Sequence, residues 1–465
     1  MLEQTKTPDK WKQSSMLMAG LSLFQSLRVA LTAARFAAKR FNIPKANVDI
    51  FISRIHTSME VSCFLGVLLM TLYIILVPRK YSKYNNFISV MTNWLLFFVY
   101  SGLLYAYASN RTEGKLTLYY WLLVVSGFSF GLNQAIVVSV GVSYVAFFTA
   151  AIPISGIEVS IYHMIFFYIA RRIGNVDVNY WIVVIQIMIA MAISGIGAIL
   201  WSYGFYKRYN GELYERKRSI FRSMKQALSP ILMSSLAMGL VFLVFPAISP
   251  YKLAEPRIAH RIDLLILFTL AIPTLINCYL CYLNIGPNVQ WKVYKGWHFC
   301  WIFLIPYIFS ITCFFISLHY QDLFISVCIR NNPFVLAVLC FVFAFSHSSL
   351  KAVGYTGAGM QELTKNGNVS AMNLLFAHSF LVIFTLLGDG YIKTFKKYER
   401  DPENWPTKEF GFWRSLWFWI RRSCSGAFKN FKASFTLDIG TQLRDRVRDI
   451  QELQSNQRIL TISQR

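Results

Sequence analysis

The chain is dominated by apolar runs of membrane-spanning length, and this feature constrains its fold more than any other. A helix needs about 20 consecutive apolar residues to cross the hydrocarbon core of a bilayer. Backbone N–H and C=O groups inside lipid must bond within their own segment, so such runs fold as helices. A composition of 55% hydrophobic and only 15% charged residues agrees, and it excludes a set of ordinary soluble domains. We therefore predict an all-α, polytopic membrane protein with about eleven transmembrane helices.

The eleven predicted spans form two groups, six before a polar segment and five after it. The first group is Met16–Lys39, Met59–Val77, Phe87–Ala108, Thr117–Tyr144, Phe147–Ala170 and Tyr180–Tyr203. The second is Leu228–Ile248, Leu264–Leu283, Trp297–Leu318, Phe334–Leu350 and Met372–Tyr391. The polar segment between them runs from Lys207 to Lys225. This division predicts two helical bundles around a site near the middle of the membrane, as in many carriers.

The same pattern predicts the regions of the chain. Residues 1–15 form a cytoplasmic N-terminus, 16–206 the N-terminal bundle, 207–226 a basic cytoplasmic loop and 227–391 the C-terminal bundle. Residues 392–465 form a basic tail with a Trp-rich interfacial helix around Phe410–Ile420. The first run contains Gln25, Arg28 and Arg35, so it is either a span or an amphipathic helix on the membrane surface.

Lys and Arg outnumber Asp and Glu by 46 to 22, which gives a net charge of +24. These basic residues lie mostly between the spans, where they contact lipid headgroups and set orientation. We therefore expect the lipid bilayer as a partner, and not nucleic acid. The Lys207–Lys225 connection is cytoplasmic by the positive-inside rule, and Lys351 belongs to a short connection on the same side. Five spans separate this loop from the basic tail. Because this number is odd, the tail is expected on the opposite side of the membrane, which conflicts with the positive-inside rule.

Gln134 lies deep inside the fourth span, where a polar side chain is costly unless it faces a partner or a water-filled cavity. Gly127 and Gly131 form a GxxxG pattern in the same span, and such small residues let helices approach closely. The Gln134 amide offers two donors and an acceptor, which suits the edge of a base or a sugar. The alternative is a polar contact between helices.

The fifth span carries Ser155 and Glu158, which share one helix face. A carboxyl at this depth is a candidate substrate ligand, a proton carrier or the partner of a buried cation, here Arg28. The alternative puts both charges near the membrane surface. In the tenth span, His347 lies among serine residues and is either a site residue or a packing residue.

No enzyme motif of the GxSxG, HExxH, P-loop or dinucleotide-binding type is present, and no cofactor or metal is expected. An intramembrane acyltransferase is the first alternative function, with only His347 and His378 as candidate catalytic residues. A receptor or scaffold that does not transport is the second alternative.

The span pattern and several short motifs resemble the equilibrative nucleoside transporters, protozoan members above all. The motifs are Gly131-Leu132-Asn133-Gln134, Pro153-Ile154-Ser155-Gly156, Phe245-Pro246-Ala247-Ile248 and Ala344-Phe345-Ser346. The resemblance implies a major-facilitator-like, two-bundle fold and the movement of nucleosides or nucleobases by alternating access, facilitative or proton-linked. It also implies that Gln134 contacts the nucleobase and that Ser155 and Gly156 line the cavity.

The chain departs from this family at several positions. Leu27 and Arg28 stand in the places of a Trp-Asn pair, and only Thr274 and Asn277 are available where the family has an Asp and an Arg four residues apart. His347-Ser348 replaces an Asn-Gly pair, and Glu158 lies where small residues are usual. These departures leave open a different substrate, or weak or absent transport.

Together these patterns predict a carrier of the plasma membrane for a nucleoside or nucleobase, with protons as a candidate coupling ion. We expect its cavity between the first, second, fourth, fifth, seventh, eighth, tenth and eleventh spans. The candidate substrate-binding residues are Gln134, Ser155, Gly156, Glu158, Arg28, Asn277 and His347.

Overall fold

A computed structural model describes residues 9–44, 47–77, 83–109, 115–207, 220–245, 248–362, 365–399 and 405–435. Every regular element within these ranges is a helix. Several sequence predictions fall outside the described residues: the start of the N-terminus, most of the basic loop at 208–219, Pro246 and Ala247 of one motif, and the tail beyond residue 435.

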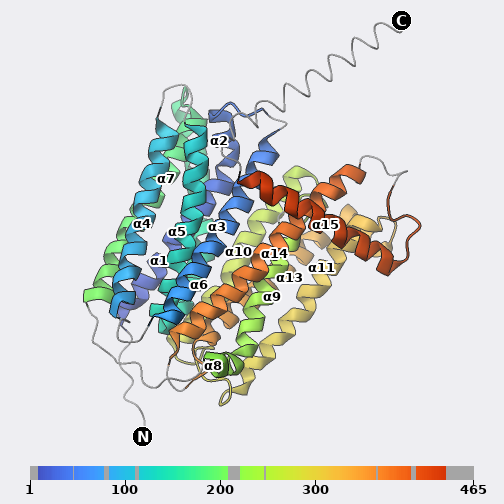
Figure 1. Ribbon diagram of the computed structural model, residues 1–465. Coiled ribbons are helices and arrows are strands. Elements are labelled where there is room, and N and C mark those ends of the chain that lie inside the picture. Colours follow the sequence, from blue (N-terminus) through green and yellow to red (C-terminus); the bar gives the residue numbers. More distant parts are fainter. Residues whose placement is uncertain are drawn as a thin grey trace, which may run out of the picture.

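Ten described helices are long and apolar enough to cross a membrane. They comprise α1 (Lys10–Thr32), α3 (Val48–Leu76), α4 (Lys83–Ala108), α5 (Leu116–Val140), α6 (Val145–Ile173), α7 (Val178–Trp201), α10 (Pro256–Tyr282), η5 with α11 (Lys295–Phe303 and Leu304–His319), α13 (Pro333–Ala358) and α14 (Gly367–Glu399). An eleventh forms if α8 (Ile220–Gln226) and α9 (Leu228–Val244), bent by 75° at their junction, count as one. The prediction of an all-α polytopic membrane protein is confirmed (Figure 1).

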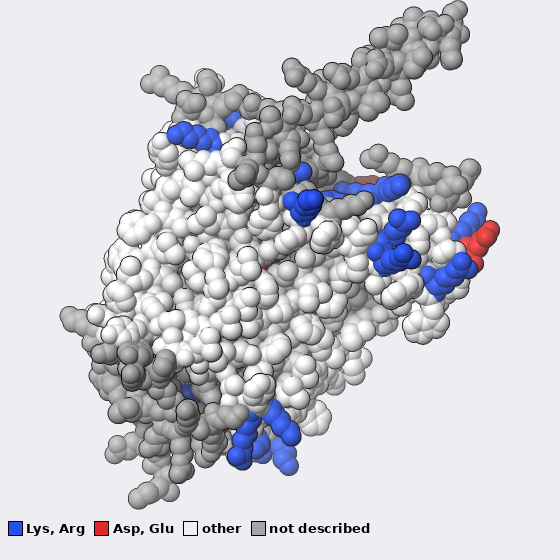
Figure 2. Space-filling model, viewed as in Figure 1, with Lys and Arg blue, Asp and Glu red and all other residues white. Residues whose placement is uncertain are grey.

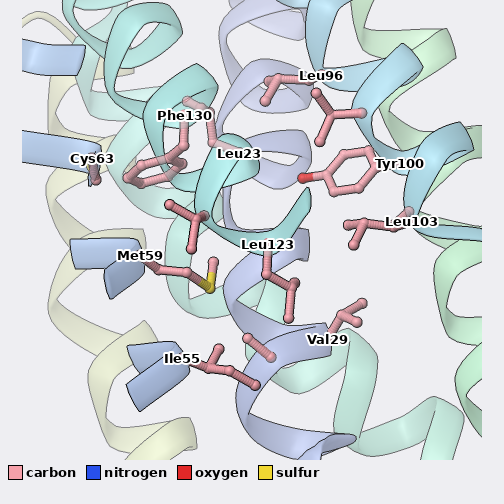
Figure 3. Packing of buried hydrophobic residues seen from close by; sticks show 14 of the residues in the cluster. Leu23, Val29, Ile55, Met59, Cys63, Leu96, Tyr100, Leu103, Leu123 and Phe130 are labelled. Atoms are coloured by element: carbon pink, nitrogen blue, oxygen red, sulfur yellow. The ribbon is translucent and has the colours of Figure 1, made fainter. Parts of the chain in front are cut away.

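Helix α1 belongs to the protein interior, so the alternative of an amphipathic surface helix is wrong. Met16, Ala19 and Leu23 are fully buried, and α1 packs against α5, α6 and α7. The helix begins at Lys10, six residues before the predicted boundary, and the short α2 (Ala34–Arg40) follows it. Its polar residues are accommodated by neighbours: the Tyr100 hydroxyl donates to the Ser22 carbonyl over 2.7 Å, and Figure 3 shows this ring pointing from α4 toward α1.

The buried apolar residues form two large clusters. The first is built mainly from α1 to α7, and the second from α9 to α13 with the C-terminal part of α14. Helix α14 packs on α9 and also on α3 and α5, so it joins the two sets of helices (Figure 1). The boundaries 16–206 and 227–391 stay predictions, and the helices at their edges are longer, since α14 continues to Glu399.

The GxxxG pattern of α5 makes the closest helix contact with α3. A Cβ atom on Gly127 would lie 2.6 Å from the Met59 carbonyl oxygen, and one on Gly131 would overlap the Cys63 carbonyl oxygen. Gly66 of α3 faces α5 in the same way, because its Cβ would overlap the Phe128 carbonyl oxygen. Small residues on both helices therefore bring the two backbones together.

Helix α15 (Phe412–Ser434) lies across the end of α14 rather than parallel to the spans (Figure 1). The two helices cross at Gly390 and Gly426, where the backbones touch. Trp419 is buried against α14, whereas Trp413 and Trp417 are exposed. Figure 2 shows that the described Lys and Arg residues of one face gather toward the two ends of a broad, largely uncharged band. This distribution is typical of a protein surface in contact with lipid.

Candidate functional site

A cavity lies in the interior where the two sets of helices meet. Its lining comes from α1, α3, α5 and α6 on one side and from α9, α13 and α14 on the other. Seven of the eight spans that were predicted to line the cavity contribute residues to it. The exception is the eighth predicted span, which corresponds to α10. About 50 Å³ of the cavity is open to water-sized molecules. Pockets that hold drug-sized ligands measure about 300–1,000 Å³, so this conformation is closed around little more than a few waters.

Most of the cavity wall is aromatic or aliphatic. Phe24 of α1 and Phe130 of α5 meet edge to face, with ring centroids 5.1 Å apart. The remaining apolar lining residues are Leu27, Met59, Phe148, Ile152, Met238, Phe242 and Leu381. Such walls suit a flat ring that buries both faces.

Gln134 enters this apolar lining from α5, on the same face as Gly127 and Phe130. The side chain is 3% exposed, and its Oε1 atom is buried without a hydrogen-bond partner. A buried amide oxygen without a partner is costly by about 1–3 kcal/mol. The glutamine is therefore a lining residue whose amide oxygen has unused hydrogen-bonding capacity.

Two charged residues that sequence reasoning did not single out also line the cavity: Glu60 of α3 and Lys351 of α13. Both are at least nine-tenths buried. The predicted second span began at Met59, but α3 begins at Val48 and carries Glu60 well inside the helix. The predicted tenth span ended at Leu350, but α13 continues to Ala358, so the prediction of Lys351 in a loop is wrong. Lys351 had been placed just beyond the end of an apolar run, whereas Glu60 was the second residue of its predicted span.

The other polar lining residues are Ser26, Thr149, Tyr355 and His378. Tyr355 lies one turn after Lys351 on α13, and its hydroxyl is buried without a partner. The Nδ1 atom of His378 lies 3.0 Å from the Leu374 carbonyl oxygen of its own helix.

Contacts between the two sets of helices lie on both sides of the cavity along α14. Toward the start of α3, the Thr57 hydroxyl donates to Asp389 of α14 over 2.6 Å. Toward the start of α14, a Cβ atom on Gly367 would overlap the Ser139 carbonyl oxygen at the end of α5. His378 and Leu381 lie between these two contacts along α14. The two sets of helices therefore touch before and after the cavity along this helix.

A second polar cluster lies beside the cavity, between α1, α6 and α10. Gln25 donates to the Glu158 carboxylate over 2.9 Å, and the Arg28 guanidinium donates to Ser155 over 3.4 Å. Arg28 is attracted electrostatically by Glu158 and by Asp263 of α10. The predicted Arg28–Glu158 partnership is thus electrostatic, and the direct bond to the carboxylate comes from Gln25. Neither charged residue lines the cavity.

The glycine at position 156 makes room for this cluster. A Cβ atom there would lie 2.8 Å from the Arg28 guanidinium.

Outside the spans, the Tyr251 hydroxyl donates to Asp263 over 3.0 Å. Burial and the neighbouring carboxylate raise the pKa of this phenol, so it stays protonated and remains a donor.

Asn277 and His347 make bonds within the second set of helices and do not line the cavity. The Asn277 amide donates to the Thr356 hydroxyl over 3.0 Å, which joins α10 to α13. The Nδ1 atom of His347 lies 2.9 Å from the Ala237 carbonyl oxygen of α9. Of the seven candidate residues, Gln134 alone belongs to the lining.

We expect Arg28→Met to destabilise the protein, because Glu158 and Asp263 lose the cation between them. The double variant Arg28→Met/Glu158→Gln should recover part of the loss, with a coupling energy of about 0.5–3 kcal/mol. Thermal unfolding of the purified variants measures both effects. Strictly additive effects would show that the two charges do not interact.

No protein-family model matches the chain, and no curated protein matches it in sequence. Solved structures do match in fold. The proton:xylose symporter XylE of the major facilitator superfamily, bound to 6-bromo-6-deoxy-D-glucose, has a TM-score of 0.54 at 12% identity, over 91% of this chain and 95% of that one. A bacterial homologue of the iron transporter ferroportin in the outward-facing state has a TM-score of 0.50 at 12% identity, over 92% and 99%.

These similarities establish the fold of the major facilitator superfamily for this integral membrane protein. They agree with the two-bundle architecture predicted from the sequence. They do not reach the equilibrative nucleoside transporter family, whose resemblance rests on the span pattern and short motifs of the sequence.

Proposed function

We propose that this protein is a carrier that moves nucleobases or nucleosides across a membrane by alternating access. The observation that carries the proposal is the buried, unpartnered Oε1 atom of Gln134 in the wall of an aromatic-lined cavity. A nucleobase presents donors and acceptors on its edge and apolar faces on both sides. Gln134 suits such an edge, and Phe24 and Phe130 suit the faces.

The position and closure of the cavity support transport rather than static binding. Its lining comes from both sets of helices, and contacts between these helices lie on two sides of it. With only about 50 Å³ open to water-sized molecules, a nucleobase enters only if one set of helices moves away from the other. Rocking of two bundles around a midplane site is the usual form of alternating access in this fold.

Transport is either facilitative or proton-linked, and two carboxyl groups are candidates for the proton. Glu60 lines the cavity, whereas Glu158 is held by Gln25 in the neighbouring cluster. A proton carrier that responds to substrate has to sense the cavity, so Glu60 is the stronger candidate. We assign the carrier to the plasma membrane as part of this proposal.

The test is uptake of labelled uracil, hypoxanthine, uridine and adenosine into vesicles that contain the purified full chain. We expect saturable uptake of at least one of them, in excess of empty vesicles. If an inward proton gradient stimulates this uptake, Glu60→Gln should abolish the stimulation and Glu158→Gln should retain it. Absence of both uptake and binding for all four compounds would contradict the proposed substrate class.

The acyltransferase alternative gains no support from the described residues. His347 bonds to a backbone carbonyl outside the cavity. His378 lines the cavity, but among the described residues its one hydrogen bond is that of Nδ1 with the Leu374 carbonyl oxygen, so no carboxylate or nucleophile is bonded to its ring. In the same vesicles, release of coenzyme A from an acyl donor would argue for the enzyme.

A further inference from the structure

Lys351 is a buried cation in the wall of the central cavity. It lies inside α13, is 9% exposed and lines the cavity together with Tyr355 one turn later. A lysine at membrane depth is expensive, and such residues pair with a carboxylate or mark the path of a ligand. The question is therefore which group compensates its charge.

Among the described residues, no group compensates the charge of Lys351. Within these ranges, Lys351 forms neither a hydrogen bond nor an ion pair. The charged residue that acts on it electrostatically is Arg28, which repels it. On its own helix His347 lies one turn earlier and is bonded to the Ala237 carbonyl. The ammonium group therefore experiences repulsion, and this lining residue has no partner among the described residues.

The carboxylate in the lining does not neutralise this cation. Glu60 faces the His56 imidazole at 3.9 Å, and it forms no ion pair with Lys351. The two residues enter the lining from different sets of helices and do not pair with each other. A ligand with one negative charge would compensate Lys351, whereas a dianionic phosphate would leave one charge uncompensated.

Two further groups can assist Lys351. The Tyr355 hydroxyl is buried without a partner and can donate to an oxyanion. Gln134 belongs to the same lining and can form hydrogen bonds with the neutral edge of the same ligand. Charge-assisted hydrogen bonds are roughly twice as strong as neutral ones, so an oxyanion at Lys351 would contribute strongly to affinity.

We propose that Lys351 is the binding group for a carboxylate on the transported molecule, with Tyr355 as second donor. This inference rests on the proposed function and narrows its substrate class to monoanionic nucleobase derivatives, such as a pyrimidine carboxylate. Lys351 then binds the carboxylate of the ligand, and Gln134 binds the edge of its nucleobase.

The test compares three ligands on the purified full chain by calorimetry: uracil, its 6-carboxylate orotate, and benzoate, which has the carboxylate without the base edge. We expect orotate to bind at least about tenfold more tightly than uracil, from one charge-assisted bond. Lys351→Met should remove that preference, and Lys351→Arg should retain part of it. Lys408→Met, the same change at an exposed lysine, should leave the preference intact.

The outcomes separate this inference from the proposed function. Equal affinity of the wild-type protein for uracil and orotate would overturn the inference and leave a carrier of neutral bases standing, even if Lys351→Met did not fold. A preference that survives Lys351→Met would overturn it as well. Lys351-dependent binding of benzoate without any binding of uracil or orotate would support the anion site and contradict the nucleobase proposal.

Discussion

Replacing Gly131 with isoleucine is expected to prevent the protein from folding. The Cβ atom alone would overlap the Cys63 carbonyl oxygen and lie 2.8 Å from the Val67 amide nitrogen. Both obstacles are backbone atoms of α3, which cannot rotate away as a side chain can. Overpacking of this kind costs at least about 1–3 kcal/mol even where neighbours can move. Here the whole helix would have to shift, so we expect a greater loss.

The measurement is the yield of monodisperse protein after extraction and its thermal unfolding temperature. Gly296→Ile is the matched control, because a Cβ atom at Gly296 meets nothing within 4 Å. The control should unfold at the wild-type temperature. A Gly131→Ile protein as stable as this control would show that the α3–α5 contact is looser than described.

Replacing Gln134 with leucine is expected to change function and stability in opposite directions. Saturable uptake should fall about tenfold or more, since the ligand loses one or two hydrogen bonds in a water-poor cavity. The unfolding temperature should rise, because the variant removes a buried oxygen atom without a partner and fills the site with a side chain of similar size.

The adjacent residue supplies the matched control. Asn133 faces α4 instead of the cavity, and its amide donates to Thr92 over 3.0 Å. Asn133→Leu should therefore lower the unfolding temperature and retain uptake per folded molecule. If Gln134→Leu transports as well as the wild-type protein, Gln134 does not bind the substrate.

The helices could be read from the sequence because membrane burial acts on each span separately. An apolar run must satisfy its backbone within itself, so the fold class and the order of the spans follow from local composition. The small-residue pattern of Gly127 and Gly131 also predicted a close helix contact, although the partner helix had to come from the structure. Gln134 was found for a related reason, since an isolated amide in a long apolar run is conspicuous.

The ends of the spans were harder to predict from the sequence. A hydropathy pattern treats a charge as the end of a helix, and so Glu60 was left at a boundary and Lys351 in a loop. In the structure, α3 and α13 continue past these residues, and Asp263 is likewise inside α10. A helix crosses such a charge when neighbouring helices shield it from lipid. That condition depends on residues hundreds of positions away.

The sequence by itself therefore determined that this chain is a bundle of about eleven spans with a few costly polar groups inside. Only the tertiary structure decided which of those groups meet. It separated Arg28, Ser155 and Glu158 from the cavity, and it brought Lys351 and Glu60 into the same wall as Gln134. The physical reason is that burial in lipid is a property of one helix, whereas a cavity is formed by the faces that several helices turn toward one another.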